Sequence, residues 1–239
     1  TVLASFLKSG SISYLYYSDR IAQLPLGIIA ISLSTVLLPN FSKAEANNDI
    51  NYIKSETIQS IKFVSMFSIP SFIGIFLLSE IIIEVLFGRG GLNSLDITSI
   101  SDALKAYSIG IPAFLLIKVL QTSFFSSGDT LTPFKISLIT VLINIILSVI
   151  LMKFYSHVGI ALASSISAFF TVFTLSLILI RRKRLSTVFL NNIFQLLFLA
   201  IPFILIMYVS ISFTQSLNIL ISLILLVLSG LVVWVFLLY

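Results

Sequence analysis

The sequence contains no cysteine, one histidine and one tryptophan, and only 10% of its 239 residues are charged. Without cysteine, the chain can form neither a disulfide nor a thiolate-ligated metal site. The single histidine, His157, has no second histidine with which to bind a metal ion. We find no nucleophile–base arrangement, no phosphate-cradling loop and no metal-ligand spacing. These absences give no support to an enzyme and predict no cofactor and no metal site.

Hydrophobic residues make up 58% of the chain, and the mean hydropathy is +1.15. A soluble domain of this size would need far more polar surface. The composition therefore predicts an all-α, polytopic transmembrane helix bundle. Lysine and arginine outnumber the acids by five, but they cluster at the ends of apolar segments, as in membrane proteins, so we expect no nucleic-acid partner.

A membrane-spanning helix needs roughly 20 apolar residues. Seven segments are complete or nearly complete spans by this measure, and a short apolar fragment at residues 1–6 resembles the end of an eighth. We expect the spans at 13–38, 63–78, 103–125, 134–152, 158–180, 188–210 and 217–238. The chain starts with Thr1 directly in apolar sequence and shows no signal-peptide pattern, so we expect it to be part of something longer.

The charges divide the chain at Arg184, because none follows it before Tyr239. We therefore expect one part at 1–184 and two further transmembrane helices at 185–239. The four basic residues at 181–184 predict a cytoplasmic loop, and alternation of the spans then places eight basic residues inside and four outside. The segment 40–60 mixes charges with asparagine and predicts an amphipathic or interfacial helix, whereas residues 87–91, which include Arg89, predict a turn.

Two adjacent charges, Asp19 and Arg20, lie inside the first complete span. A charge at the centre of a membrane helix costs at least a few kcal/mol and normally faces a cavity or a partner. On a helix, Arg20 shares a face with Tyr16, Gln23 and Gly27. This polar face suits the wall of a hydrated cavity, and the guanidinium suits a phosphate or carboxylate group. The alternatives are that Asp19 neutralises Arg20, or that both reach the outer interface.

Lys118 also lies well inside a span, at 103–125. It is either a second cavity cation or gate partner, or a lysine whose long side chain extends to the inner interface.

Asn144 and Ser148 are one helical turn apart, and Ser164 and Ser165 lie in the next span. Their oxygens could together bind a small cation. The alternative is that they form hydrogen bonds between helices, as such residues commonly do in membranes. In the loop before this pair of spans, Asp129, Thr130 or Thr132 is expected to cap the helix whose first turn contains Pro133.

Residues 16–27 read YYSDRIAQLPLG, and residues 35–39 read TVLLP. These segments resemble the patterns Y-A-D-R-x-x-x-x-P-x-G and T-x-L-L-P of the MurJ/MviN lipid II flippases, a family in the multidrug/oligosaccharidyl-lipid/polysaccharide exporter superfamily. Further similarity lies at 106–114 (AYSIGIPAF), 118–120 (KVL) and 128–136 (GDTLTPFKI). The resemblance covers residues 1 to about 184, and the last two spans match in kind only.

The resemblance implies a two-lobe protein of fourteen spans, of which this chain is the C-terminal half. Residues 1–184 would be the C-terminal transport lobe, from the end of span 7 to span 12, and 185–239 would be the last two spans, which line a groove for the lipid tail. The implied activity is alternating-access transport of lipid II, the undecaprenyl-diphosphate-linked peptidoglycan precursor, across the bacterial cytoplasmic (inner) membrane. The implied partners are lipid II, membrane lipids and the N-terminal lobe, and Arg20 matches a cavity arginine of the family.

The chain departs from the family at several positions. Gln23 stands where many relatives have an acid, and Ser127 and Leu131 stand where relatives often have arginine. A sodium site of some relatives uses an asparagine and an acid, whereas this chain has Asn144 and Ser148. The rival interpretations are an exporter of another lipid-linked glycan or of a drug, a subunit that acts only with a separate N-terminal chain, and a non-functional fragment.

Overall fold

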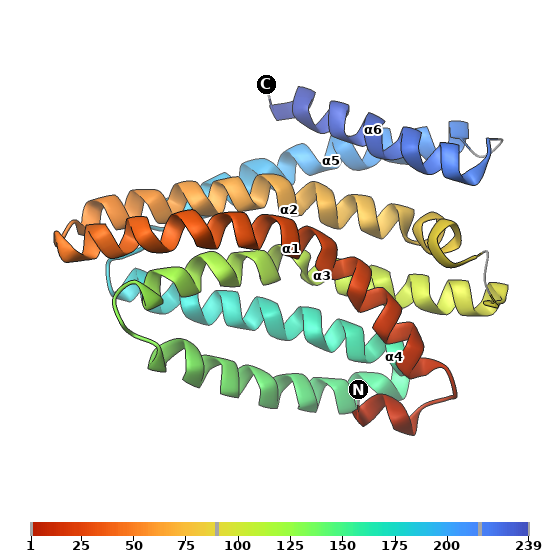
Figure 1. Cartoon of the computed structure of the whole chain (residues 1–239), viewed down its shortest axis with the longest axis horizontal. Coiled ribbons are helices and arrows are strands. Elements are labelled where there is room, and N and C mark those ends of the chain that lie inside the picture. Colours follow the sequence, from red (N-terminus) through yellow and green to blue (C-terminus); the bar gives the residue numbers. More distant parts are fainter. Residues whose placement is uncertain (1, 89–90, 215–216, 239) are drawn as a thin grey trace.

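The computed structural model describes residues 2–88, 91–214 and 217–238, without the side chains of 2, 30–34 and 192. All regular elements in these ranges are helical, which confirms the all-α prediction (Figure 1). They are η1 (Val2–Phe6), α1 (Ser11–Ala46), α2 (Ile50–Phe87), α3 (Ser94–Phe125), α4 (Leu131–Arg181), α5 (Val188–Thr214) and α6 (Ile219–Leu238).

Five helices in the described part of the chain, α2 to α6, are long and apolar enough to cross a membrane. The 51 residues of α4 would extend roughly 75 Å as one straight helix, far more than the roughly 30 Å of a bilayer core. Ser156, with φ 52° and ψ −133°, breaks α4 into two arms at 131–155 and 157–181 that run side by side (Figure 1). This break coincides with the predicted boundary between the spans 134–152 and 158–180.

The segment 40–60 does not form the separate interfacial helix that its charges predicted. Pro39 lies inside α1 without ending it, and α1 continues to Ala46. A short turn follows, with φ 54° at Asn48, and α2 begins at Ile50. Asp49 caps α2 by accepting a hydrogen bond from the Tyr52 backbone N–H at 2.9 Å. The polar segment therefore consists of the ends of two long helices. Of the predicted turn at 87–91, Arg89 and Gly90 lie outside the described residues.

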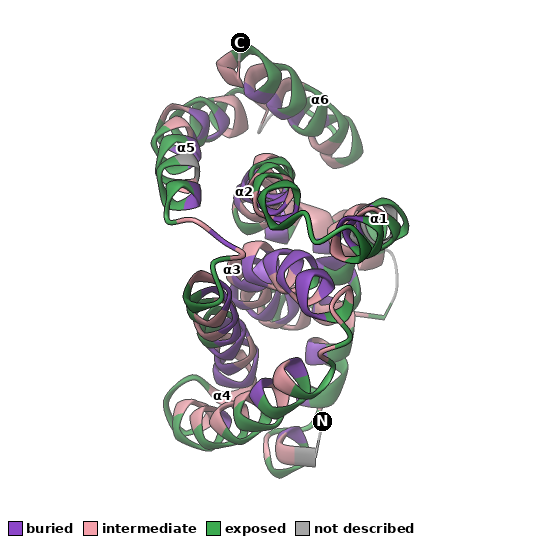
Figure 2. Ribbon diagram, turned by 90° about the vertical axis from the view of Figure 1, so that its left-hand side faces the viewer, coloured by how far each residue is buried: buried purple, intermediate pink, exposed green. Residues whose placement is uncertain are grey.

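Helix α3 lies at the centre of the bundle and packs against α1, α2 and α4 (Figure 2). Small residues allow these close approaches, as is usual between membrane helices. A Cβ added to Gly110 would lie only 2.7 Å from the Ser165 hydroxyl oxygen. That hydroxyl donates to the Ala106 carbonyl at 2.7 Å, and the Ser18 hydroxyl of α1 donates to the Ile100 carbonyl at 2.8 Å. Both hydrogen bonds fix a neighbouring helix to α3.

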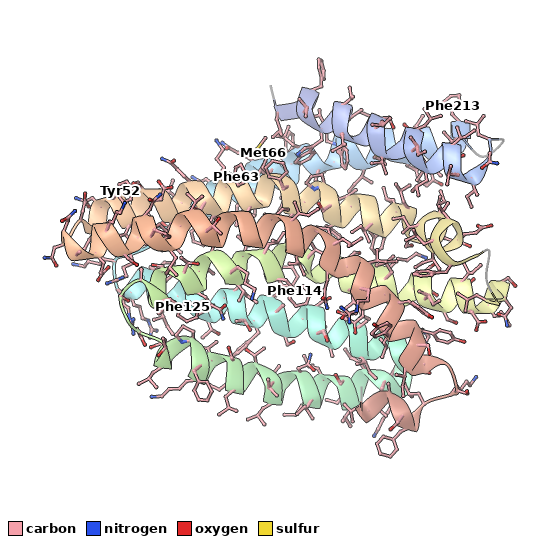
Figure 3. The ribbon with its side chains drawn as sticks, viewed as in Figure 1. Tyr52, Phe63, Met66, Phe114, Phe125 and Phe213 are labelled. Atoms are coloured by element: carbon pink, nitrogen blue, oxygen red, sulfur yellow. The ribbon has the colours of Figure 1, made fainter. Side chains whose placement is uncertain are left out.

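Helices α5 and α6 pack on α2 and on each other (Figures 1 and 2). Pro70 of α2 has no N–H, so the Met66 carbonyl one turn earlier lacks its helical donor. The indole N–H of Trp234 in α6 donates to this carbonyl at 2.8 Å, at the level of α2 where Figure 3 labels Met66. The carbonyl that Pro70 leaves without a helical donor in α2 thus accepts the hydrogen bond that holds α6. The predicted division of the chain at residue 184 stays a prediction.

Replacing Gly110 by valine should destabilise the bundle by about 1–3 kcal/mol, because the added side chain overpacks the contact between α3 and α4. The free energy of unfolding in detergent measures the effect. Gly74→Val is the matched control, since nothing lies within 4 Å of a Cβ added there. Equal losses in the two variants would contradict the close packing at Gly110.

Trp234→Phe should cost about 1 kcal/mol, because it keeps an aromatic ring but leaves the Met66 carbonyl without a donor in an apolar environment. Protease or hydrogen-exchange protection of α6 measures the loosening of this helix. Tyr208→Phe, which removes a polar group from an exposed position of α5, is the control. Unchanged protection of α6 in Trp234→Phe would show that the hydrogen bond does not hold this helix.

Candidate functional site

The first half of α1 carries the predicted polar face. Tyr16, Arg20, Gln23 and Gly27 are all exposed in the structure, at the helical spacing that places them on one side of α1. The opposite side of the helix packs on α3 through buried residues such as Ser18 and Ala22. The predicted face therefore exists and is not covered by any other described part of this chain.

Arg20 does not pair with its neighbour Asp19. Its guanidinium carbon lies 5.0 Å from the centre of the Tyr16 ring, a cation–π contact. The Asp19 carboxylate instead accepts a hydrogen bond from the Gln23 side chain. Three ion pairs occur among the described residues, and none includes Arg20. Successive residues of a helix point about 100° apart, which explains why the two charges separate. The alternative that Asp19 neutralises Arg20 is thus not what the geometry shows.

Asp19 faces a pocket of about 280 Å³ between α1, α3 and the second arm of α4. Two tyrosines of α1 and Tyr107 of α3 give this pocket a partly polar, aromatic wall. Its complete lining is Ile12, Ser13, Leu15, Tyr16, Tyr17, Asp19, Tyr107 and Ile160.

Lys118 is exposed on α3 and does not line the pocket that Asp19 faces. It follows Tyr107 and Phe114 at offsets of eleven and four residues, so the three share one face of α3. Lys118 lies roughly 16 Å from Tyr107 along the helix axis. Among the described residues it forms no ion pair. The structure therefore places Lys118 on the helix face that carries Tyr107, but not in one site with Asp19.

Asn144 and Ser164 lie together, as predicted, in a polar seam between the arms of α4. The Asn144 amide donates to the hydroxyl oxygens of Ser164 at 3.3 Å and Ser167 at 3.1 Å. The Thr140 and Thr171 hydroxyls hydrogen-bond at 2.7 Å in the same seam. The residues beside a pocket of about 250 Å³ here are Phe114, Ile117, Thr140, Val141, Asn144, Ser164, Ser167, Ala168 and Thr171.

Ser148, the third member of the predicted cation site, is buried but does not line this pocket. Sequence reasoning instead missed Ser167, Thr140 and Thr171. Ser167 lies three and Thr171 seven residues after Ser164, and Thr140 lies four residues before Asn144, so these spacings place them on the same helix faces. The observed contacts are hydrogen bonds between the two arms, and cation binding here stays a prediction.

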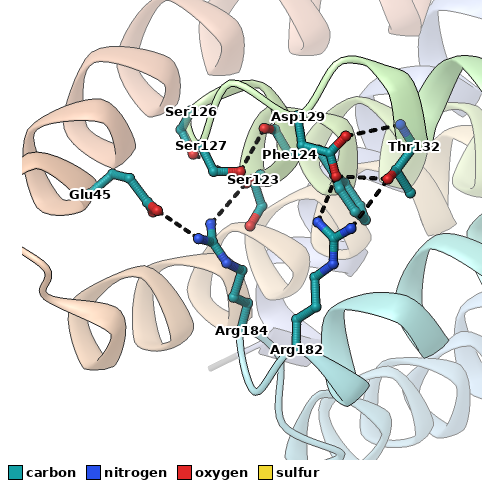
Figure 4. Close-up of polar contacts among 9 residues, drawn as sticks. All are labelled: Glu45, Ser123, Phe124, Ser126, Ser127, Asp129, Thr132, Arg182 and Arg184. Atoms are coloured by element: carbon teal, nitrogen blue, oxygen red, sulfur yellow. Dashed lines mark hydrogen bonds and ion pairs between the residues drawn. The ribbon is translucent and has the colours of Figure 1, made fainter.

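The basic cluster at 181–184 contains two ion pairs that the sequence did not indicate. Arg182 contacts the Asp129 carboxylate at 2.6 Å, and Arg184 contacts the Glu45 carboxylate at 2.6 Å (Figure 4). Arg184 also donates to the Ser123 carbonyl at 3.4 Å. Arg182 and Asp129 are 53 residues apart in the chain, and Arg184 and Glu45 are 139 residues apart. The two ion pairs therefore join the ends of α1, α3 and α4.

Of the three predicted caps of α4, the Thr130 side chain forms no capping hydrogen bond. Another of the three, Asp129, does. Its carboxylate accepts hydrogen bonds from the Thr132 backbone N–H at 3.0 Å and from the Thr132 hydroxyl at 2.7 Å. These bonds, followed by the hydrogen bond and charge of Arg182, lower the pKa of Asp129 to about 2. The charged carboxylate is therefore favoured in the folded protein.

Asp129→Asn should reduce thermal stability at pH 5, with the difference from the unmodified protein shrinking as the pH falls from about 4 to about 2. A pKa lowered by folding contributes stability that is present above the unfolded-state pKa and is lost as the pH approaches the folded-state value. Melting curves of both proteins in the same detergent measure this difference.

Arg182→Gln, which removes the same ion pair from its other side, should reproduce part of the loss at pH 5. A stability difference for Asp129→Asn that stays constant from pH 5 to pH 2 would contradict the role of the ionised carboxylate.

Comparison with known proteins places this geometry in one family. The family model described as Lipid II flippase MurJ matches residues 1–230. The probable lipid II flippase MurJ of Rickettsia prowazekii is 40% identical over 172 residues, which are 71% of this chain and 33% of that protein. The corresponding protein of Vibrio cholerae is 40% identical over 167 residues, 70% of this chain and 32% of the relative.

A solved structure, "Lipid II flippase MurJ, inward closed conformation", superimposes with a TM-score of 0.85 at 29% identity. The match covers 98% of this chain and 48% of the solved chain, so the sequence spans about half the length of that protein. The matched regions of the relatives cover about a third of their length. The chain belongs to the MurJ family of lipid II flippases.

Proposed function

We propose that this chain is the C-terminal lobe of a lipid II flippase, which moves the undecaprenyl-diphosphate-linked peptidoglycan precursor across the bacterial cytoplasmic membrane. The family membership supports this function, and the match to nearly half of a solved MurJ supports the division into lobes. The whole activity requires an N-terminal lobe of the kind that accounts for the remaining length of the relatives.

The unpaired guanidinium of Arg20 is the observation that carries the proposal. Arg20 lies on a predicted membrane span, is exposed, and forms no ion pair within the described residues. The Tyr16 ring contacts the guanidinium and leaves its N–H groups free to donate. A planar fork of donors is suited to a diphosphate, which it can bind through charge-assisted hydrogen bonds. Arg20 is the diphosphate contact of this lobe.

The exposed face of α1 needs a partner surface to form a closed cavity. In many transporters, two lobes rock around a midplane site and expose it to each side of the membrane in turn. The N-terminal lobe would cover the face that carries Tyr16, Arg20 and Gln23. The ion pairs of Arg182 and Arg184 would lie at the cytoplasmic end, in accord with the excess of basic residues there.

Arg20→Ala in the full-length flippase, which joins this lobe to an N-terminal lobe, should abolish complementation of a flippase-depleted strain. Arg20→Lys should restore only part of the activity, because an ammonium group lacks the planar fork. The measurement is colony formation together with the amount of protein in the membrane. Arg181→Ala is the matched control, since it removes an exposed arginine that forms no ion pair within the described residues.

Full complementation by Arg20→Ala would contradict the proposal. A second measurement compares the affinity of the purified protein for lipid II with its affinity for other polyprenyl-diphosphate sugars. A preference for another sugar would favour a different exporter of the same superfamily.

A further inference from the structure

The pocket beside Asp19 is distinct from the surface that presents Arg20. Its walls come from α1, α3 and the second arm of α4, so this chain forms it alone. Tyr16 contributes to both places, because its ring contacts the Arg20 guanidinium and also lines the pocket. An anion-binding surface and the Asp19 pocket therefore lie next to each other on one lobe.

The polar groups of the pocket are suited to a cation. One oxygen of the Asp19 carboxylate accepts from Gln23, and the other has no hydrogen-bond partner among the described residues. The Tyr107 hydroxyl likewise forms no hydrogen bond within the part of the chain that the structure describes. The rings of Tyr16 and Tyr17 stand edge to face, with their centres 6.0 Å apart. The Asp19 carboxylate attracts a positive charge, and the tyrosine side chains line the same pocket.

The lining favours an organic ammonium over a metal ion. A calcium ion takes six to eight oxygen ligands, and magnesium an octahedral set. The pocket offers one carboxylate, a serine and tyrosine hydroxyls, and the rest of its wall includes the apolar side chains of Ile12, Leu15 and Ile160. Apolar walls suit the carbon stem of an amine, whose ammonium group can meet the carboxylate while its methylene groups contact the aliphatic side chains.

We propose that this pocket binds the ammonium group of an amino acid side chain in the peptide part of the substrate, with Asp19 as its counter-ion. This inference rests on the proposed function, because it takes the substrate to carry both a diphosphate and a peptide. Arg20 then holds the anionic part while Asp19 holds the cationic part. The two neighbouring residues of α1, whose side chains point apart on the helix, recognise opposite charges of one zwitterionic molecule.

The test compares two forms of lipid II whose pentapeptides differ only at a lysine, free in one and Nε-acetylated in the other. The full-length flippase containing this lobe is purified in nanodiscs, and the dissociation constant of each lipid is measured. The unmodified protein should bind the free-amine form roughly tenfold more tightly. Asp19→Asn, which preserves shape and the acceptor for Gln23, should bind both forms equally. Arg20→Ala should weaken both forms by the same factor.

Each outcome of this binding test decides between the inference, the proposed function and a metal site. Equal binding of the two lipids by the unmodified protein would overturn the inference, and so would a preference that survives in Asp19→Asn. Equal affinities that both rise with sodium and lose this dependence in Asp19→Asn would assign the pocket to a metal ion and overturn it too. Binding that is insensitive to Arg20→Ala would instead contradict the proposed function. Unchanged melting temperatures of the variants would confirm that folding is not the cause.

Discussion

The structure depends on one constraint: inside a membrane, each polar group that is not satisfied within the protein costs several kcal/mol. The bundle meets this constraint because polar groups of one helix form hydrogen bonds with a neighbouring helix. Trp234 supplies the donor that Pro70 removes from α2, and Ser165 and Ser18 donate to carbonyls of α3. Asn144 joins the two arms of α4. These hydrogen bonds hold the described helices of the chain to one another.

Against this background, the charged residues fall into two groups. Arg182 and Arg184 are bound to carboxylates and hold the ends of α1, α3 and α4 together. Arg20 and Lys118 form no ion pair among the described residues and are exposed. The same type of side chain thus has a structural role at the end of the bundle and an available charge within it. The presence or absence of a carboxylate within reach, rather than the residue type, decides which role a basic side chain has.

Most of the correct predictions from the sequence came from local patterns. Apolar length predicted the helices, and helical spacing predicted the exposed face of Tyr16, Arg20 and Gln23. The pattern failed where the outcome depends on distant residues. The charges of 40–60 suggested a separate helix, but α1 continues through Pro39 to Ala46. The pairing of Arg184 with Glu45 spans 139 residues, and no local spacing could indicate it. Likewise, the hydrogen bond from Asn144 to Ser167 depends on how the turn at Ser156 aligns the two arms.

The separation of Asp19 from Arg20 follows from helix geometry alone, since adjacent side chains point about 100° apart. A carboxylate one turn away from Arg20 could have reached the guanidinium and neutralised it. This chain has Gln23 near that position, and its amide binds Asp19 instead. Gln23 therefore binds the Asp19 carboxylate and leaves the guanidinium without a competing anion. For the diphosphate contact proposed above, this arrangement means that no internal ion pair would have to break when the substrate arrives.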